Sequence, residues 1–485
     1  MQINITEWST KIKELLKGKQ KKYAIMTMGC QLNENDSEKI SGMCSNFGFD
    51  KTSNLEESDL IIFNTCCVRE NAEDKLFGKL GEVKKYKEEK GTIIAIGGCM
   101  MQEKHIVNKI KSSYPFVDIL FGTHTLEQFP KDLYLALKEN QKIEDILDIE
   151  GNIYEGIPVQ RDDKIKASVS IMNGCNNFCT YCIVPYVRGR ERSRNPQDII
   201  NEVQYLAENG YKEIMLLGQN VNSYLVSQKQ KGENVDFEVE IKEIDNANKT
   251  NTNNKMIVNS FATLLKAINK IEGIERIRFI SPHPKDFTTD VIEAIRDCKH
   301  VCKLIHLPLQ SGSSDVLKRM NRKYTKEQYL DLAKKIKETI PEIAFSTDII
   351  VGFPGETEND FEETLDVVKK VNFEQVYMFI YSRRVGTPAD KMENQVEENI
   401  KHERFDKLKK LSEEIIENKN KSYVGTIQEV LVEGKSKNNE EMYTGRTQTN
   451  KVVNFEGNDE MIGKLKKVKI ISEHIWYLKG KYDKI

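Results

Sequence analysis

The stretch GCNNFCTYC, residues 174–182, carries three cysteines with the spacing C-x-x-x-C-x-x-C. It follows an apolar run, Ala167 to Met172, that is typical of a β-strand. Three thiolates on a short loop can bind one iron–sulfur cubane and leave its fourth iron open to a ligand. A zinc knuckle is the weaker alternative, because no histidine lies nearby to complete it. We therefore predict an iron–sulfur cluster on Cys175, Cys179 and Cys182.

The region around this loop alternates six times between strand-like and helix-like segments. Such alternation predicts a partial (β/α)6 barrel whose chemistry lies on the loops at the carboxyl ends of its strands. Two of those loops are Gly218-Gln219-Asn220 and the segment Gly352 to Glu356. The six expected strands are Ala167 to Met172, Glu213 to Leu217, Arg276 to Ile280, Lys303 to Leu307, Ala344 to Val351 and Gln375 to Tyr381.

A second set of cysteines follows three apolar runs near the start of the chain. Cys30 comes after Tyr23 to Met28, Cys66 after Leu60 to Asn64, and Cys99 after Thr92 to Ile96. Because a parallel sheet brings such strand ends to one edge, we expect the three thiols to converge. They are candidates for a second cluster, and the alternative is a set of buried structural thiols.

Composition places limits on the kind of protein. The chain has 485 residues and a formal net charge of −2, with 73 Lys plus Arg against 75 Asp plus Glu. This balance excludes a highly cationic nucleic-acid binder but not a local basic groove. No apolar stretch is long enough for a membrane span, and the first residues do not read as a secretory signal. We expect a cytoplasmic protein, in which ten cysteines indicate metal or catalytic use rather than disulfides.

Changes of pattern divide the chain into four parts. We expect an N-terminal α/β parallel-sheet domain at 21–140, the barrel at 161–396, a helical connector at 397–423 and a small β-barrel at 424–485. The fold class is thus α/β with a β-barrel at the end. Within the barrel, residues 227–255 are rich in Asn, Lys and Glu, and we expect them to form a disordered insertion.

Alternating arginines follow the cysteine loop at positions 188, 190, 192 and 194. Such arginines usually lie on a solvated surface, but next to a reactive site guanidinium groups can also clamp a phosphate or carboxylate. Both interpretations stay open at this point. The candidate RNA contacts are Arg188 and Arg190, together with Arg446 of the C-terminal barrel.

Taken together, the cysteine sets and the barrel resemble the methylthiotransferase family of radical S-adenosylmethionine enzymes, from Tyr23 to Lys481. The resemblance implies a radical S-adenosylmethionine barrel between an N-terminal methylthiotransferase domain and a C-terminal TRAM domain that binds tRNA. It implies one 4Fe-4S cluster on Cys175, Cys179 and Cys182, which cleaves S-adenosylmethionine to a 5′-deoxyadenosyl radical. A second 4Fe-4S cluster falls on Cys30, Cys66 and Cys99, since in the family the cysteine directly after Asn-Thr is the ligand rather than its neighbour Cys67.

The resemblance also suggests where S-adenosylmethionine binds. The family's glycine-glycine-glutamate turn after the second barrel strand appears here as Gly218-Gln219-Asn220, so Gly218 and Gln219 are candidates by position. Gly352 and Gly355 belong to a segment that looks like the family's later loop on the adenine side.

Three further segments, Ser281 to Pro284, Ile305 to Gly312 and Thr444 to Phe455, match the branch of the family that acts on the tRNA anticodon stem-loop. For that branch the resemblance implies methylthiolation of carbon 2 of N(6)-isopentenyladenosine, with two S-adenosylmethionines per turnover. It implies an electron donor, such as flavodoxin or ferredoxin, and a sulfur donor as partners. The alternatives are the same chemistry on N(6)-threonylcarbamoyladenosine tRNA or on a ribosomal-protein aspartate, or a non-catalytic iron–sulfur RNA-binding protein.

Overall fold

The buried strands of the chain assemble into two units in the computed structural model. The described residues are 5–67, 72–147, 153, 155–245, 250–437 and 439–482. The N-terminal unit comprises Met1–Asp162, Asn173–Asn176 and Cys182–Arg192, and the barrel unit comprises Asp163–Met172, Asn177–Tyr181 and Ser193–Ile485.

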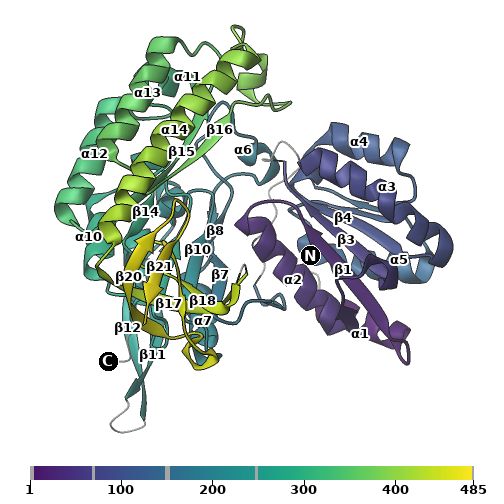
Figure 1. Cartoon of the computed structure of the whole chain (residues 1–485). Coiled ribbons are helices and arrows are strands. Elements are labelled where there is room, and N and C mark those ends of the chain that lie inside the picture. Colours follow the sequence, from purple (N-terminus) through teal and green to yellow (C-terminus); the bar gives the residue numbers. More distant parts are fainter. Residues whose placement is uncertain are drawn as a thin grey trace. The chain divides into compact units, whose positions relative to one another are not determined.

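The N-terminal unit is built on a parallel sheet with the strand order β2-β1-β3-β4-β5-β6. Its central strands β3 (Leu60–Thr65) and β4 (Ile93–Gly98) are buried along their whole length, as expected for a parallel sheet covered on both faces. Helices α1 (Ile5–Leu16), α2 (Gln31–Phe47) and α5 (Phe129–Glu139) pack on one face, and α3 (Ala72–Lys90) and α4 (Lys104–Ser113) on the other (Figure 1). The remaining strands are β1 (Lys21–Thr27), β2 (Phe49–Lys51), β5 (Ile119–Phe121) and β6 (Ile143–Asp145).

All three strands predicted in this unit are present as β1, β3 and β4. The sequence interpretation missed β2, β5 and β6, which have three residues each and offer too few positions for a periodic pattern.

The barrel unit contains all six predicted strands, arranged as two parallel three-stranded sheets. An isolated parallel β-bridge joins Ile277 of the third strand to Val301, which precedes the fourth strand. A large hydrophobic core fills the space between these strands and their helices. The strands are β7 (Lys166–Ser170), β10 (Glu213–Leu217), β13 (Arg276–Phe279), β14 (Leu304–His306), β15 (Ala344–Val351) and β16 (Gln375–Ile380). The main helices are α7 (Pro196–Glu208), α9 (Phe261–Ile268), α10 (Thr289–Asp297), α11 (Ser314–Arg319), α12 (Lys326–Thr339) and α13 (Glu358–Val371).

The segment 227–255 is ordered over most of its length, so the prediction of a disordered insertion was wrong. After the short helix α8 (Val226–Gln230), strands β11 (Phe237–Asp245) and β12 (Thr250–Val258) pair as an antiparallel hairpin. Val239, Ile241 and Val258 are buried in the barrel core, whereas Glu238 and Glu240 are exposed. This is the period-two pattern of a half-buried strand, which the polar composition of the segment obscured. Residues 246–249 lie outside the described residues.

A long helix, α14 (Glu398–Tyr423), leads to a closed five-stranded barrel at the C-terminus. Closure leaves this small sheet without an unpaired edge. Its strands are β17 (Ile427–Ser436), β18 (Asn439–Arg446), β19 (Val452–Glu456), β20 (Leu465–Glu473) and β21 (Leu478–Lys481), in the order β17-β18-β19-β21-β20.

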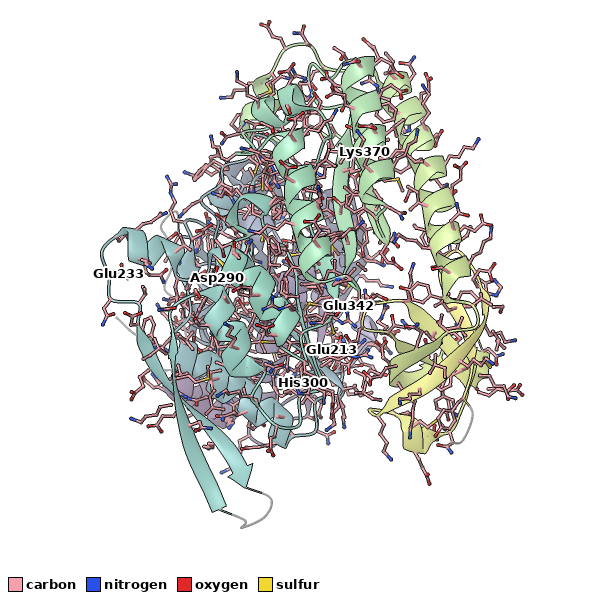
Figure 2. All side chains as sticks on the ribbon, turned by 90° about the vertical axis from the view of Figure 1, so that its left-hand side faces the viewer. Glu213, Glu233, Asp290, His300, Glu342 and Lys370 are labelled. Atoms are coloured by element: carbon pink, nitrogen blue, oxygen red, sulfur yellow. The ribbon has the colours of Figure 1, made fainter. Side chains whose placement is uncertain are left out.

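Two buried arginines of β13 attach this C-terminal barrel to the rest of its unit. Arg276 donates to the carbonyl oxygens of Arg446 and Glu429, the latter at 2.9 Å. Arg278 donates to the carbonyl oxygens of Thr447 at 2.8 Å and Gln448 at 3.0 Å. It also pairs at 3.0 Å with Glu213, which is labelled in Figure 2. Unpaired buried charges are costly, so the carbonyl oxygens of the C-terminal barrel stabilise these two arginines.

Across the part of the chain that the structure describes, we find no helix with the length and hydrophobicity of a membrane span.

The hairpin provides a test of the corrected fold. Replacing Ile241 with Ala should lower the free energy of unfolding by about 2–5 kcal/mol, because a buried side chain is lost and a cavity remains. Lys242→Ala, on the exposed face of the same strand, should change it by less than about 0.5 kcal/mol. Urea unfolding of both variants measures the difference, and equal stability would show that β11 does not contribute to the core.

Candidate metal centres and cofactor site

Neighbouring strands of the N-terminal sheet bring the second set of cysteines together. Cys30 follows β1, Cys66 follows β3, and Cys99 begins the 3-10 helix η2 (Cys99–Gln102) directly after β4. The side chains of Cys30 and Cys66 share a hydrogen bond, as do those of Cys67 and Cys99. Cys66 and Cys99 are buried, while Cys30 is exposed. The three cysteines therefore converge as predicted, with Cys67 among them.

Glycines allow the backbone to approach these thiols closely. A Cβ atom on Gly29 would lie 2.8 Å from the Cβ of Cys66, and one on Gly98 would lie 2.4 Å from the carbonyl oxygen of Thr65. Gly98 also has a φ of 98°, which side chains rarely tolerate. The positions before Cys30 and Cys99 can thus hold only glycine without movement of the cysteine segments.

A buried arginine supplies the positive charge at this cysteine site. Nε of Arg188 donates to Sγ of Cys99 at 3.1 Å, and its Nη2 pairs with Asp36 at 2.9 Å. Burial lowers the pKa of Arg188, but the charges of Cys99, Asp36 and Cys30 outweigh it and raise the pKa above its usual value. Arg188 is buried and its partners Cys99 and Asp36 lie within the protein, which favours support of a cysteine over the predicted contact with RNA.

The same surroundings favour the thiolate forms that bind metals. The hydrogen bond with Cys66 lowers the pKa of Cys30 to about 5, with a contribution from the charge of Arg188 and against the effect of burial. The pKa of Cys99 is lowered by its hydrogen bond with Cys67 and by Arg188, again against burial. Cys67 behaves in the opposite way, because its hydrogen bond with Cys99 and its burial raise its pKa. Deprotonated thiols are the ligating form.

Among the described residues, no three His, Cys, Asp or Glu side chains lie close enough to hold a single metal ion. A four-iron cluster differs, because each thiolate binds a different iron atom and the ring of sulfurs is wider. The convergent thiols, the close glycine backbone and the buried guanidinium fit such a cluster better than they fit one ion.

The arginine-rich segment holds the start of the predicted radical-cluster loop. In the N-terminal unit, the amide of Cys175 donates to the carbonyl oxygen of Gly189 at 3.1 Å. Gly174 has a φ of 80°, and a Cβ atom there would lie 2.0 Å from the carbonyl oxygen of Arg190. Asn176 and Glu191 exchange two hydrogen bonds between backbone and side chain, at 3.2 and 3.3 Å. The arginine-rich segment therefore supports the start of the loop.

Cys179 lies in the barrel unit, where a second buried arginine contacts it. Nη1 of Arg322 donates to Sγ of Cys179 at 3.4 Å, and Tyr324 and the carbonyl oxygen of Pro308 accept its other hydrogen bonds. Burial lowers the pKa of Arg322, but Tyr324, Tyr181 and Cys179 together raise it well above its usual value. Nδ2 of Asn321 donates to the carbonyl oxygen of Phe178 at 2.9 Å, which fixes the left-handed residue before Cys179. The sequence interpretation missed Arg322, which is 143 residues from Cys179 in the chain.

The candidate cofactor residues lie at the carboxyl ends of β10 and β15, as expected. A Cβ atom on Gly218 would lie 2.6 Å from Met172, so this turn has no room for a side chain. The side-chain oxygen of Gln219 is buried and has no hydrogen-bond partner among the described residues. A buried acceptor of this kind suits an ammonium or amine donor.

The second loop is held by a buried carboxylate. Gly352 has a φ of 74°, and its amide donates to Oε1 of Glu356 at 2.9 Å. Glu356 also pairs with Arg404 at 2.8 Å, although burial raises its pKa to about 7. Gly355 has a φ of 76°, and its carbonyl oxygen accepts from Arg319 at 3.0 Å. Both glycines are thus required by the backbone conformation.

The other arginines differ in their surroundings. Arg190 is exposed, whereas Arg194 is buried and pairs with Glu202 at 2.8 Å. Arg446 is partly exposed and pairs with Glu433 at 3.4 Å. Arg190 and Arg446 therefore stay candidates for RNA contacts.

Three family models match separate parts of the chain. Residues 169–368 match the model of the radical SAM superfamily, and residues 421–482 match the TRAM domain. Residues 22–122 match a family described as uncharacterized protein family UPF0004. The methyltransferase TsrM from Kitasatospora setae, a radical S-adenosylmethionine enzyme, shares the fold with a TM-score of 0.52 at 12% identity, over 76% of this chain and 75% of that chain.

Curated relatives are similar over almost the whole length. A protein of Clostridium botulinum (strain Alaska E43 / Type E3) is 53% identical over 462 residues, which cover 95% of both chains. One of Clostridium beijerinckii is 53% identical over 472 residues, which cover 97% of this chain and 98% of the relative. Both bear the name tRNA-2-methylthio-N(6)-dimethylallyladenosine synthase. Together with the radical SAM and TRAM matches, this similarity shows that the chain belongs to the tRNA-2-methylthio-N(6)-dimethylallyladenosine synthase family of radical S-adenosylmethionine methylthiotransferases.

Proposed function

We propose that this protein methylthiolates carbon 2 of N(6)-isopentenyladenosine, also called dimethylallyladenosine, next to the anticodon of tRNA. The observation that carries the proposal is 53% identity over 95% of the chain with a relative named for this reaction. The relatives do not favour a threonylcarbamoyl substrate, a ribosomal-protein aspartate or a non-catalytic role. Reduced thiols and a tRNA substrate fit a cytoplasmic location.

The radical SAM domain implies S-adenosylmethionine and one 4Fe-4S cluster. We assign this cluster to Cys175, Cys179 and Cys182, and a second 4Fe-4S cluster to Cys30, Cys66 and Cys99. When bound, the two clusters and S-adenosylmethionine together would supply a 5′-deoxyadenosyl radical, a methyl group and sulfur. Two S-adenosylmethionines are used per turnover. A reductant such as flavodoxin or ferredoxin and a sulfur donor are then needed as partners.

Two buried arginines support the assignment of two clusters. Arg188 donates to Cys99 and Arg322 donates to Cys179, so a ligand of each proposed cluster receives an N–H from a guanidinium. Hydrogen bonds to ligand sulfurs orient the ligands and tune iron–sulfur centres. A buried positive charge also offsets the negative charge of the thiolates. The role of each arginine is thus to hold and neutralise a ligand.

The two glycine loops are suited to hold S-adenosylmethionine. The buried oxygen of Gln219 can accept a hydrogen bond from the amino group of the cofactor. Gly218, Gly352 and Gly355 allow the backbone to approach a ligand closely, because side chains are excluded there or disfavoured by φ. The TRAM domain supports tRNA binding, and we assign Arg190 and Arg446 to contacts with its phosphates.

The substrate assignment is tested with two anticodon stem-loops that differ only in the isopentenyl group. A five-carbon apolar group in a dry pocket contributes up to about 4 kcal/mol at ~0.8 kcal/mol per carbon, or nearly a thousandfold. Mass analysis of the nucleosides, at equal salt and reductant, should show methylthiolation of the isopentenylated RNA only. Equal modification of both RNAs, or a preference for a threonylcarbamoyl RNA, would reject the assignment.

The role of Arg188 is tested by the iron content of the purified protein. Arg188→Gln should weaken iron retention at the second cluster about 10- to 100-fold in a chelator challenge, the usual effect of losing a residue that supports a metal ligand. Reductive cleavage of S-adenosylmethionine should continue, because Cys175, Cys179 and Cys182 are unchanged. Arg190→Gln makes the same change on an exposed side chain and should not alter iron retention. Equal iron retention in both variants would contradict the role.

A further inference from the structure

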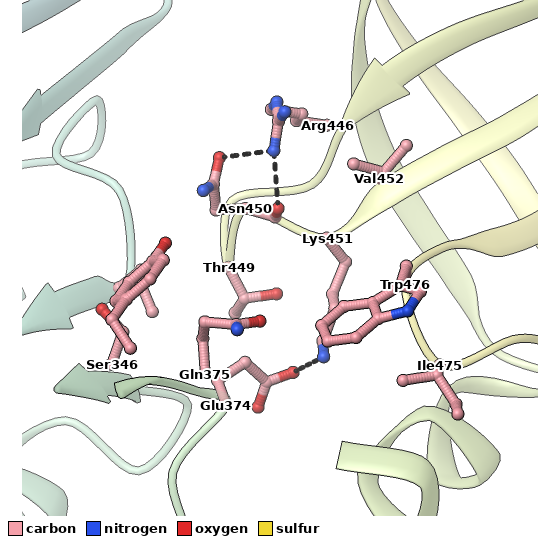
Figure 3. A pocket seen from close by; sticks show the side chains of 12 residues that line it. Ser346, Glu374, Gln375, Arg446, Thr449, Asn450, Lys451, Val452, Ile475 and Trp476 are labelled. Carbon is pink, nitrogen blue, oxygen red and sulfur yellow. Dashed lines mark hydrogen bonds and ion pairs between the residues drawn. The ribbon is translucent and has the colours of Figure 1, made fainter. Parts of the chain in front are cut away.

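Exposed aromatic side chains lie along strand β16 and beside a pocket at the C-terminal barrel. Tyr377 and Phe379 are two residues apart on this edge strand, so they share one face, and they are 46% and 50% exposed. Trp476, in the turn between β20 and β21, is 62% exposed. Trp476 and Tyr377 line the same pocket, which has a volume of about 130 Å³. Trp476 is labelled in Figure 3. We call Trp476, Tyr377 and Phe379 the aromatic track.

The turn that carries Trp476 is held rigidly. Asn420 of α14 is buried, and its Nδ2 donates to the carbonyl oxygens of His474 at 2.7 Å and Ile475 at 3.0 Å. Within the turn, the amide of His474 donates to the carbonyl oxygen of Tyr477 at 2.9 Å, and the two rings stack 4.3 Å apart. The indole is therefore presented to solvent by an ordered backbone. An ordered, exposed indole is ready to bind a partner with little loss of entropy.

Basic side chains lie at two sides of the pocket, each with a carboxylate partner. Lys451 and Lys419 share the single carboxylate of Glu374, at 3.1 and 3.2 Å. These three side chains together therefore carry one net positive charge. Arg446 lies at the opposite side of the pocket from Glu374, where its Nη1 donates to Asn450 (Figure 3) and its Nε pairs with Glu433 at 3.4 Å. Aromatic faces beside guanidinium and ammonium groups fit a ligand that has both flat bases and phosphates.

We propose that the aromatic track binds unpaired nucleotides of the RNA substrate by stacking, with Arg446 against a phosphate. The identity of the RNA rests on the proposed function. The stacking contact is inferred from the aromatic side chains and does not depend on that function. Every base has an aromatic face, so stacking tolerates different sequences. An apolar peptide would fit less well, because it offers no partner for the net positive charge of the group formed by Lys451, Lys419 and Glu374.

The distance between the pocket and the candidate cofactor loop limits which nucleotide the pocket can take. Ser346 of β15 lines the pocket, and Val351 ends the same strand beside the candidate cofactor loop. Five residues of strand span roughly 17 Å at ~3.3 Å per residue. A nucleotide in the pocket is therefore not the reacting adenosine but another nucleotide of the same RNA.

Binding of an isopentenylated anticodon stem-loop to the cluster-loaded full chain tests the track. Trp476→Ala and Phe379→Ala should each raise Kd about 5- to 100-fold, while Trp476→Phe should stay close to the parent because the stack is kept. Tyr205→Ala is the matched control, since Tyr205 is 60% exposed on α7, outside the track. Arg446→Gln should reduce the salt dependence of binding by about one counterion, whereas Trp476→Ala should leave it unchanged.

Fluorescence gives a direct second readout. The chain has two tryptophans, so in a Trp8→Phe background Trp476 is the reporter, and we expect its emission to be quenched when the stem-loop binds. Unchanged Kd in Trp476→Ala and Phe379→Ala together with unquenched emission would overturn the track. If the parent still forms the methylthiolated nucleoside, that result leaves the proposed function intact. Conversely, suppose that Trp476→Ala and Phe379→Ala bind the stem-loop more weakly but the parent forms no methylthiolated nucleoside. That result would reject the proposed function and support the RNA site.

Discussion

Thiolates buried at the edge of a parallel sheet need a positive charge beside them, and this constraint organises the candidate site. Arg188 meets it in the N-terminal unit, where its guanidinium lies between Cys99 and Asp36. Removing one member of a buried ion pair typically costs about 3–5 kcal/mol, because the partner charge remains without compensation. Its two ion contacts therefore fix the position of Arg188, and its charge helps to lower the pKa of the Cys30 and Cys99 thiols.

The same short segment serves both proposed clusters. Residues 182–192 belong to the N-terminal unit although the barrel unit continues on both sides of them in sequence. This segment starts with Cys182, a proposed ligand of the radical cluster, and Arg188 follows six residues later beside Cys99. In the barrel unit, Arg322 repeats the arrangement toward Cys179. Each proposed cluster thus has one ligand that is fixed by an arginine from a distant part of the chain, and a change in either arginine acts on the ligand and not on the substrate.

Much of the fold could be predicted from the sequence, because the longer strands carry their own signal. The strands before Cys30, Cys66 and Cys99 read as apolar runs, and parallel topology then requires the three thiols to converge. Three-residue strands such as β2 carry no such signal. The β11–β12 hairpin did carry one in its alternation, but its polar composition dominated the interpretation. The role of Arg188 could not be predicted, since its partners Cys99 and Asp36 are 89 and 152 residues away. Arg322 is 143 residues from Cys179, so its role was hidden for the same reason.

The central claim is that two independent cysteine sets hold two clusters. The most direct measurement is Mössbauer quantification of cluster iron per chain in the parent protein and in Cys66→Ala, Cys67→Ala and Cys182→Ala. Cys66→Ala and Cys182→Ala should each keep about half of the iron, because each loses one of two equal clusters. Cys67→Ala should keep all of it. Full iron content in Cys66→Ala with loss in Cys67→Ala would reverse the choice between the adjacent thiols, and complete loss of iron in either single variant would contradict two independent sites.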